Sequence, residues 1–427
     1  MGSSSSAWPL PADAPSDDDL SRCVHCGLCL SSCPTYLVTG QEMNSPRGRI
    51  YLARSIAEGT LIQTPAIERH WDLCLQCRAC EPACPSGVAY GRIMEHVRAQ
   101  VATEPTSQRA QRRLRRFVLR QVVARPTVLA AVTAPLRALA RLLQGRNLRL
   151  PRVGRRLLSQ VPIGQGAPAR AGFESPTPGP CVGTVALLTG CVMGELFGEV
   201  HRATARVLNR RGLDVVAPSA QGCCGALHAH DGDLAFAREL ARRNIAAFED
   251  GAYDAIVVNS AGCGAAMKEY GDLLREDSRW AERARRFSSR VKDFSEYVVA
   301  LAGPASKFDA KVTYQDACHL AHAQRIVSQP RELLRAVEGV ELVETTGADR
   351  CCGAAGIYSL VQPKMSAELR RRKAVELEAS GAGVIVTTNP GCHLQYLAAC
   401  AERGIDAEVL HLAELLDRAE TAVERRP

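Results

Sequence analysis

CVHCGLCLSSCP at residues 23–34 returns 51 positions later as CLQCRACEPACP at residues 74–85. In both copies two, two and three residues separate the four cysteines, and a proline follows the last one. Three cysteines at this spacing can surround one [4Fe–4S] cube from a single loop, whereas the fourth lies too far round the loop and ligates the other cube. We therefore predict two clusters with crossed ligation: one held by Cys23, Cys26, Cys29 and Cys84, the other by Cys74, Cys77, Cys80 and Cys33. Zinc ribbons use two Cys-x-x-Cys pairs instead, so a zinc scaffold without a redox role is the weaker alternative.

The composition narrows the class of protein. The chain has 427 residues, a length that suggests about three domains. A net charge of +8 with 5% aromatic residues gives no support to nucleic-acid binding. No uncharged apolar run of about 18 residues is present, so we expect no spanning helix. We see no export signal either, and 18 cysteines in a reducing, cytoplasmic setting favour metal binding over disulfides.

A second, longer repeat follows. Cys191, Cys223-Cys224-Gly225 and Cys263 are echoed by Cys318, Cys351-Cys352-Gly353 and Cys392, at offsets of 127, 128 and 129 residues. Similarity at such a fixed period indicates two copies of one unit. Short apolar runs such as 184–190 and 384–389 alternate with segments of helical periodicity. This alternation predicts two α/β units with parallel sheets.

The cysteines of this second repeat are candidate metal ligands. Several fall directly after predicted strands, where ligands collect on open α/β sheets. The glycine after each cysteine pair allows the backbone to bend so that both thiols serve one site. Buried apolar cysteines are the alternative, and either a third ordinary cluster or one site shared between the copies stays open. The predicted metal ligands are Cys191, Cys223, Cys224, Cys263, Cys318, Cys351, Cys352 and Cys392. Cys181, Cys400, His319 and His393 are not counted among them.

The organisation of the chain follows from these motifs. We expect a disordered tail (1–20), a two-[4Fe–4S] domain (21–97), an arginine-rich helical connector and linker (98–180), and two repeat units (181–302 and 303–427). Residues 98–156 hold fifteen arginines and one acid, and Pro126 and Pro135 are expected to divide them into short helices. Such a basic stretch can lie on anionic lipid or dock an acidic partner, or be a solvated face.

Seven strings together resemble the iron–sulfur subunits of bacterial glycolate oxidase (glycolate dehydrogenase), a family of CCG-domain proteins. Related families are the lactate-utilisation iron–sulfur proteins, the C subunit of anaerobic glycerol-3-phosphate dehydrogenase and the D subunit of heterodisulfide reductase. The resemblance runs from about residue 21 to the end of the chain. The strings are CVHCGLCLSSCPTY (23–36), SPRGRIYLAR (45–54), DLCLQCRACEPACPSGVAYG (72–91), GCCGA (222–226), SAGCGAAMKEYG (260–271), ACHLAHAQ (317–324) and CCGAAGIYSL (351–360).

The resemblance implies a mixed α + α/β fold: a helical, two-cluster ferredoxin-like N-terminal domain followed by two tandem α/β CCG units. It also implies an electron-transfer subunit of a flavin-dependent 2-hydroxyacid dehydrogenase. FAD-containing partner subunits would oxidise glycolate to glyoxylate, and this chain would carry electrons towards the quinone pool at the inner face of the cytoplasmic membrane. We predict no catalytic residue in this chain, since no nucleotide or nucleophile motif stands out.

The alternative is a catalytic subunit of the heterodisulfide- or quinone-reductase type that uses the CCG site for chemistry. The heterodisulfide reductase pattern ends each repeat in Cys-x-x-Cys. Here Ala266 and Gln395 stand at the second cysteine position. The resemblance therefore gives no support to a five-cysteine site in either repeat.

Overall fold

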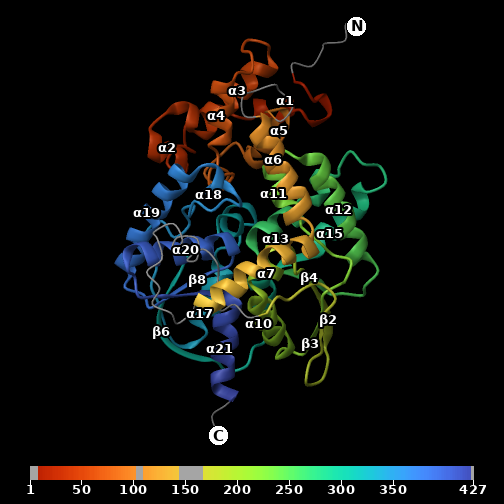
Figure 1. Ribbon diagram of the computed structural model, residues 1–427, viewed down its shortest axis with the longest axis vertical. Helices are drawn as coiled ribbons and strands as arrows, with labels where there is room; N and C mark the ends of the chain where they lie inside the picture. The colour runs from red at the N-terminus through yellow and green to blue at the C-terminus, as the bar shows by residue number, and fades with distance from the viewer. Residues whose placement is uncertain (1–7, 102–108, 144–166, 425–427) are drawn as a thin grey trace.

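A computed structural model of the chain describes residues 8–101, 109–143 and 167–424. Figure 1 shows a helical N-terminal domain at one end and two α/β units beneath it, with the connector crossing their surface. The N-terminal domain contains two 3₁₀ turns, η1 (Pro11–Asp13) and η2 (Glu42–Asn44), and the helices α1 (Asp17–Ser21), α2 (Pro34–Thr39), α3 (Pro46–Ala57), α4 (Pro65–Asp72) and α5 (Tyr90–Val101).

The helices of the N-terminal domain begin where the local sequence favours a helix start. A proline stands in the first turn of α2, α3 and α4, where its missing N–H costs nothing. The Ser45 and Thr64 side chains cap α3 and α4 by accepting backbone N–H groups. Trp71, Ile93 and Met94 fill the core between these helices.

Residues 8–20 are packed against this domain, which corrects the expectation of a disordered tail up to residue 20. The Trp8 ring lies 6.3 Å from the Trp71 ring, centroid to centroid, and Leu20 is buried in the same core. Asp19 forms a two-point ion pair with Arg92 of α5. Buried aromatic area and this ion pair hold the segment, although its acidic composition suggested disorder. Residues 1–7 lie outside the described part.

The first CCG unit is built on a five-stranded sheet with strand order β1-β3-β2-β4-β5. All neighbours are parallel except the short β1, which pairs antiparallel with β3. The strands are β1 (Glu174–Ser175), β2 (Gly183–Leu187), β3 (Leu213–Val216), β4 (Ala255–Val258) and β5 (Val291–Asp293). The helices are α9 (Val192–Leu196), α10 (Gly198–Asn209), α11 (Ala226–His230), α12 (Leu234–Glu249), α13 (Ala261–Lys268), α14 (Tyr270–Leu273), α15 (Ala281–Arg290) and α16 (Phe294–Val298).

The second CCG unit has a four-stranded, wholly parallel sheet with strand order β7-β6-β8-β9. The two sheets agree with the α/β alternation expected from the repeat. The strands are β6 (Lys307–Tyr314), β7 (Glu338–Leu342), β8 (Val384–Thr387) and β9 (Glu408–His411). The helical segments are η4 (His319–Ala323, a π-turn), α17 (Ser328–Arg335), α18 (Tyr358–Val361), α19 (Pro363–Ser380), α20 (Pro390–Arg403) and α21 (Leu412–Glu424).

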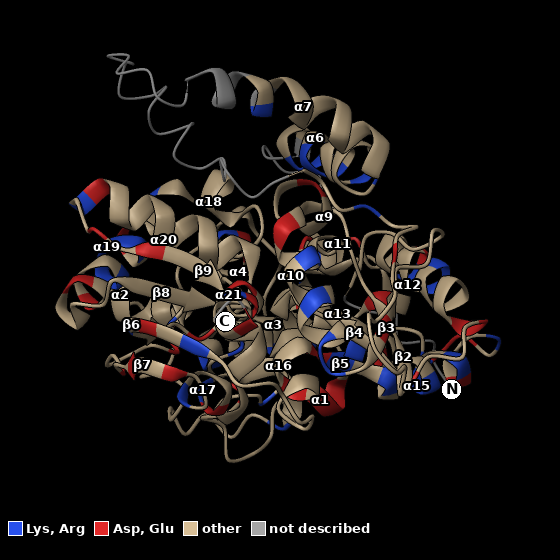
Figure 2. Cartoon of the chain, turned by 90° about the horizontal axis from the view of Figure 1, so that it is seen from below, with Lys and Arg blue, Asp and Glu red and all other residues tan. Residues whose placement is uncertain are grey.

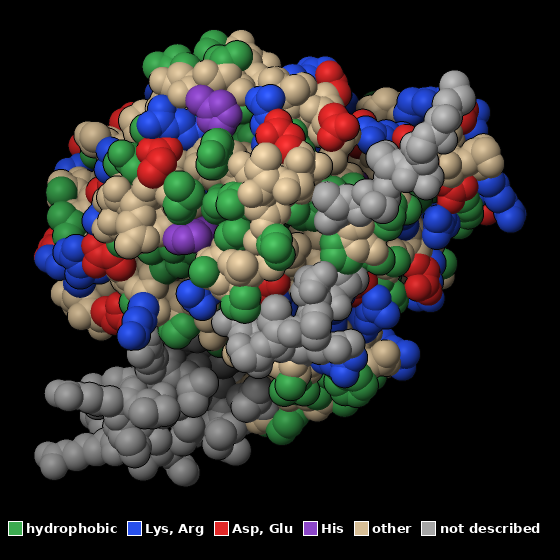
Figure 3. Space-filling model, turned by 90° about the horizontal axis from the view of Figure 1, so that it is seen from above, with side chains coloured by type: hydrophobic (Ala, Val, Ile, Leu, Met, Phe, Trp, Pro, Cys, Tyr) green, Lys and Arg blue, Asp and Glu red, His purple; other side chains and the backbone are tan. Residues whose placement is uncertain are grey.

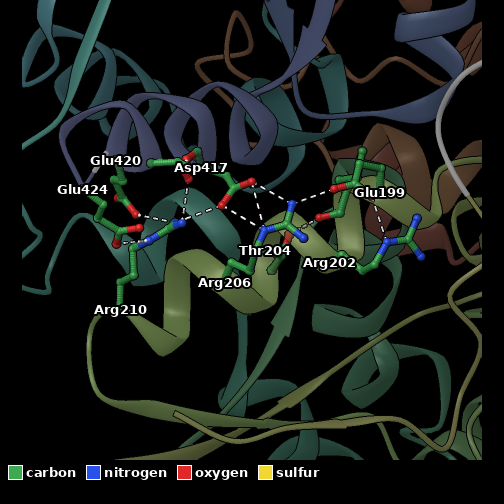
Figure 4. A network of polar contacts seen from close by, with 10 residues as sticks. Glu199, Arg202, Thr204, Arg206, Arg210, Asp417, Glu420 and Glu424 are labelled. Atoms are coloured by element: carbon green, nitrogen blue, oxygen red, sulfur yellow. Dashed lines mark hydrogen bonds and ion pairs between the residues drawn. The ribbon is translucent and has the colours of Figure 1, made fainter. Parts of the chain in front are cut away.

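The two CCG units share one hydrophobic core. Leu208 and Val257 of the first unit belong to the same buried cluster as Val386 and Leu415 of the second. Helices α10 and α21 pack against each other, and an ion-pair network covers their contact (Figure 4). In that network Asp417 of α21 pairs with Arg206 of α10 at 2.7 Å and with Arg210, the residue that directly follows α10, at 2.9 Å.

The connector consists of α6 (Arg109–Val118), a π-helical turn η3 (Leu119–Val123) and α7 (Pro126–Leu143). Pro126 starts α7 as expected, but Pro135 lies inside that helix, so the predicted division there is wrong. A proline removes one backbone hydrogen bond, and α7 continues past it. Residues 102–108 and 144–166 of the predicted connector lie outside the described part.

The arginines of the connector bind acids of this same chain. Arg112 reaches Glu68 and Asp72 of the N-terminal domain, at 3.0 and 2.6 Å. Beyond it the connector pairs with the first CCG unit through Arg115–Asp231, Arg120–Asp233 and Arg137–Glu195. Figure 2 shows α6 and α7 lying over α9 and α11. These arginines thus fasten the connector to both domains instead of facing outward.

In the described part of the chain, no single helix is long and apolar enough to cross a membrane. One sharply bent pair, Ala110–Val123 with Pro126–Pro135, meets the length and composition test only when its two arms are taken together, at a bend of 94°.

Candidate metal centres

The two N-terminal cysteine loops have the same backbone shape. His25 and Gly27 in the first loop have positive φ angles of 55° and 87°, and the matching residues of the second loop, Gln76 and Arg78, have 53° and 62°. Left-handed backbone costs a non-glycine residue energy, so three such residues mark a shape that the loops need. The curled loops aim their cysteines inward, and the Gln76 N–H lies 3.3 Å from the Cys74 sulfur.

The first group of thiols combines cysteines from both loops. Burial raises the pKa of Cys23, and the neighbouring thiols of Cys84 and Cys26 raise it further. Burial also raises the pKa of Cys29, to about 11. Cys84, the last cysteine of the second motif, is therefore a neighbour of the first loop. Cys26 is exposed, so this group reaches the molecular surface.

The second group of thiols is buried more deeply. Burial raises the pKa of Cys80 well above its usual range, and nearby Cys77, Cys74 and Cys33 act in the same direction. Burial likewise raises the pKa of Cys33, which has Cys77 as a neighbour. Cys33, the last cysteine of the first motif, thus lies with the second loop.

A guanidinium and a phenol stand beside the second group. Arg49 of α3 is almost wholly buried and donates hydrogen bonds to the His70 carbonyl at 2.7 Å and to the Thr35 hydroxyl at 3.0 Å. The pKa of Arg49 is raised despite its burial, because Tyr90, Cys74 and Cys33 surround it. The Tyr90 hydroxyl lies 3.7 Å from the Cys74 sulfur. Sequence reasoning missed both residues, although Arg49 stands in the quoted string SPRGRIYLAR.

The four thiols of the first CCG unit lie together at the carboxyl end of its sheet. The Cys191 and Cys223 sulfurs are 3.7 Å apart, and Cys224 is within hydrogen-bonding reach of both Cys223 and Cys263. Gly225 has the left-handed backbone expected of it, with φ at 85°. The Tyr270 hydroxyl holds the loop by donating to the Cys224 carbonyl at 2.7 Å.

The second CCG unit repeats this arrangement and adds a contact to the N-terminal domain. Cys351 is within hydrogen-bonding reach of Cys318 and Cys352, and also of Cys77 in the second N-terminal loop. The hydrogen bond with Cys351 lowers the pKa of Cys77. Cys352 in turn contacts Cys392. The second N-terminal thiol group and the second CCG group are therefore direct neighbours.

Both CCG units hold the second N-terminal loop in place. The Tyr358 hydroxyl of the second unit donates to the Leu73 carbonyl at 2.8 Å. Arg98 of α5 donates to the carbonyls of Cys74 and of His230 in the first unit, at 2.5 and 2.7 Å. A cavity of about 500 Å³ opens beside this junction, lined by the N-terminal loops and by Cys351.

The four residues left out of the predicted ligand set each have a different environment. Cys181 is exposed, and Cys400 is buried with its pKa raised by burial to about 11. His319 lies 3.8 Å from the Cys318 sulfur and stacks on His230, with ring centroids 5.1 Å apart. His393 packs edge-on against the Phe197 ring.

The donor atoms of these four groups suit iron–sulfur clusters. Every group consists of thiols, the ligands that hold iron–sulfur cubes. Gathered thiolates repel one another and are costly to bury. Burial and neighbouring thiols raise the pKa of Cys80, and the hydrogen bond with Cys223 together with burial raises the pKa of Cys191. In the described residues, no three His, Cys, Asp or Glu side chains stand close enough for a single metal ion. A four-iron cluster is a larger object, with each thiolate at a separate corner.

Comparison with known proteins agrees with this description. Residues 19–88 match the family model of the 4Fe-4S dicluster domain, and residues 185–268 and 312–396 match that of the cysteine-rich CCG domain. The chain is 38% identical over 421 residues to the probable glycolate oxidase iron–sulfur subunit of Bacillus subtilis, covering 94% of both chains. It is 34% identical over 412 residues to the glycolate oxidase iron–sulfur subunit of Escherichia coli, covering 94% of this chain and 95% of that one. Lactate utilization protein A of Oceanobacillus iheyensis is 29% identical over 236 residues, which are 55% of this chain and 96% of that protein.

Proposed function

The chain belongs to the family of glycolate oxidase iron–sulfur subunits, and on that premise we propose that it carries electrons for a complex that oxidises glycolate or a similar 2-hydroxyacid. The observation that carries this proposal is the gathering of sixteen cysteines into four thiol groups, in a chain that aligns with two such subunits over nearly its whole length. The substrate would be oxidised on an FAD-containing partner subunit, with electrons leaving towards a quinone.

The residues that would hold the N-terminal clusters follow the crossed scheme. Iron–sulfur clusters supply one-electron transfer, and the protein sets their position and electrostatic surroundings. The proximity of Cys84 to Cys23 supports one cluster on Cys23, Cys26, Cys29 and Cys84. The proximity of Cys33 to Cys77 and Cys80 supports the other on Cys74, Cys77, Cys80 and Cys33.

The thiols of the CCG units are the proposed place of further iron–sulfur binding. The contact between Cys77 and Cys351 would put such a centre next to the second N-terminal cluster. That contact favours an electron path from the N-terminal domain into the second CCG unit. The ligands would be Cys318, Cys351, Cys352 and Cys392 there, and Cys191, Cys223, Cys224 and Cys263 in the first unit.

The exposed loop around Cys26 is the proposed docking face for the flavin-containing partner. Val24 and Leu28 flank Cys26 and are 68% and 58% exposed. Figure 3 views the end of the molecule that carries this domain and shows hydrophobic side chains spread across it. Exposed apolar side chains beside a thiol group that reaches the surface fit a partner that must bring its flavin close.

The experiment is anaerobic reconstitution with the flavin-containing subunits. Reduction of the iron–sulfur centres is monitored by electron paramagnetic resonance (EPR). Glycolate is expected to reduce them only when the flavoprotein is present, whereas dithionite should reduce them with or without it. Full glycolate turnover with an iron-free preparation of this chain would contradict the proposal. For the docking face, Val24→Asp with Leu28→Asp should weaken binding at unchanged iron content. Val182→Asp, at a site 76% exposed in the first CCG unit, is the matched control.

A further inference from the structure

One buried histidine in the first CCG unit lies next to polar side chains without making a hydrogen bond of ordinary geometry to them. His228 lies in α11, directly after the Cys223-Cys224-Gly225 loop, and is fully buried. Neither of its ring nitrogens makes a hydrogen bond within the described part of the chain. A polar ring kept from water without partners costs free energy, so its place calls for a ligand or a function.

The surroundings of His228 fix the orientation of its ring. The Phe236 ring packs edge-on against it, with centroids 4.7 Å apart. Behind it lies Asp233, whose Oδ2 is 3.8 Å from the His228 Nδ1. Arg120 of the connector donates two hydrogen bonds to this buried carboxylate, at 2.6 and 2.5 Å. A histidine that ligates a metal commonly donates its other ring N–H to a carboxylate, and Asp233 is the carboxylate nearest to that position here.

On its other side, His228 faces the thiol group. Cys223 is the neighbour of its ring on this side. The Cys223 sulfur lies 3.7 Å from that of Cys191 and 3.5 Å from the Gly225 nitrogen. The ring therefore stands between a carboxylate fixed by the connector and the centre of the candidate metal site.

The second CCG unit does not repeat this pair of residues in its sequence, and the histidine beside its thiols, His319, stands next to Cys318 instead. At the same distance from its cysteine pair, Gly356 stands in place of His228 and Val361 in place of Asp233. His393 in the second unit is also buried with both ring nitrogens unpaired, and Phe197 packs edge-on against its ring as Phe236 does against His228, but no ion pair among the described residues joins it to a carboxylate. The imidazole–carboxylate pair thus distinguishes the first site from its duplicate.

We propose that His228 is an imidazole ligand of an iron–sulfur centre in the first CCG unit, in addition to thiols from Cys191, Cys223, Cys224 and Cys263. Asp233 and Arg120 are positioning residues that hold the ring. The inference rests on the proposed function to the extent that this unit binds an iron–sulfur centre. It predicts mixed nitrogen and sulfur ligation in the first unit and thiol ligation alone in the second.

The experiment detects the nitrogen directly. The full chain is labelled with ¹⁵N-histidine, reconstituted anaerobically with iron and sulfide, and studied by pulsed EPR for strongly coupled nitrogen. We expect such a coupling in the wild type, its loss in His228→Gln and its survival in the matched control His393→Gln. Asp233→Asn should keep the coupling but change its size. Cys263→Ser identifies the signal, because it should remove the centre that carries the coupling.

Two kinds of result, in the nitrogen coupling and in the iron content, would overturn the inference. One is a strong nitrogen coupling unchanged by His228→Gln, or no such coupling in a wild type whose first unit is loaded. The other is an iron content that Cys191→Ser and Cys263→Ser leave at the wild-type value, which would mean that the first unit binds no centre. Neither result touches the proposed function, because glycolate-driven reduction of the N-terminal clusters is measured separately. If any variant fails to reconstitute, the ¹⁵N spectrum of the wild type still decides, against an unlabelled sample.

Discussion

The Arg49 guanidinium donates a hydrogen bond to the Thr35 hydroxyl at 3.0 Å, and that hydroxyl lies 3.3 Å from the Cys33 sulfur. A buried positive charge is thereby joined through one side chain to a predicted cluster ligand. Coulombic attraction in a site with little water favours the more negative, reduced state of a nearby cluster. Arg49 is therefore expected to raise the reduction potential of the second N-terminal cluster.

Removal of that charge should lower the potential. We expect Arg49→Gln to shift the second cluster to a more negative potential and Arg49→Lys to retain part of the effect. Arg54→Gln, an exposed change on the same helix, is the control, because Arg54 forms a surface ion pair with Glu58. EPR-monitored redox titration measures the potentials. Equal potentials in Arg49→Gln and the wild type would refute the assignment.

Crossed ligation makes a prediction that uncrossed ligation does not. Cys33→Ser should damage the cluster of Cys74, Cys77 and Cys80 and leave the cluster of Cys23 intact. Cys84→Ser should do the reverse. Iron analysis and the EPR signals of each variant test this, and the wild type should contain about eight iron atoms for two cubes, and about twelve or sixteen if one or both CCG units also hold a cube. Loss of the Cys23 cluster in Cys33→Ser and of the Cys74 cluster in Cys84→Ser would mean that the ligation is uncrossed.

The connector is expected to add stability through one buried arginine. Arg112→Gln would leave the carboxylates of Glu68 and Asp72 without their partner, and breaking a buried ion pair in this way costs about 3–5 kcal/mol. Arg113→Gln on the same helix is the matched control, since Arg113 is exposed and surface charges contribute little. Urea unfolding of the two variants measures the difference. Equal destabilisation would show that Arg112 does not fasten the connector.

His411 should make the fold sensitive to acid. Its Nδ1 accepts the Ala413 N–H at 3.1 Å and its Nε2 lies 2.9 Å from the Asn259 carbonyl, so the buried ring is held neutral. Burial lowers its pKa to about 4. The unfolded chain takes up a proton below about pH 6.5 while the folded chain does not, so the histidine's contribution is lost as the pH falls from there, by about 1.4 kcal/mol per pH unit.

The measurement is the slope of unfolding free energy against pH. Between pH 6 and 5, the slope for His411→Gln should be smaller than that of the wild type by the contribution of one proton, about 1.4 kcal/mol per pH unit. Above pH 7 the two slopes should be equal. Asp293 and Glu414 act in the opposite direction, because burial raises their pKa values to about 6 and about 7. The comparison with the wild type isolates His411 from them. An unaltered slope below pH 6 would contradict the prediction.

Local patterns in the sequence predicted much of this molecule. Short apolar runs predicted the strands at 184–187 and 384–387. The period of the repeat predicted that the two cysteine pairs lie in two copies of one α/β unit. The contact between Cys77 and Cys351 could not be predicted, because no spacing relates a loop of one domain to a loop of another. The same is true of Trp8, whose burial depends on a Trp71 ring far along the chain.

The arginine-rich segment shows why composition alone misleads. Its charge suggested a lipid or partner surface, but Arg112, Arg115 and Arg120 bind acids that are scattered through two other domains. Each of those acids is unremarkable in its own stretch of sequence. Only the fold brings them under the connector, and His228 gains its place beside the Cys223 thiol in the same way.

The packing of α21 against α10 has a consequence for synthesis of the chain. Helix α21 is the last described element, yet its Leu412 and Leu415 complete a core that begins at Val185. While these residues are still inside the ribosome's exit tunnel they cannot take their place, so the core of the first CCG unit would stay incomplete until residues 412–424 have emerged. Polypeptides truncated before residue 412 should therefore be degraded by proteases and should not form a smaller functional protein.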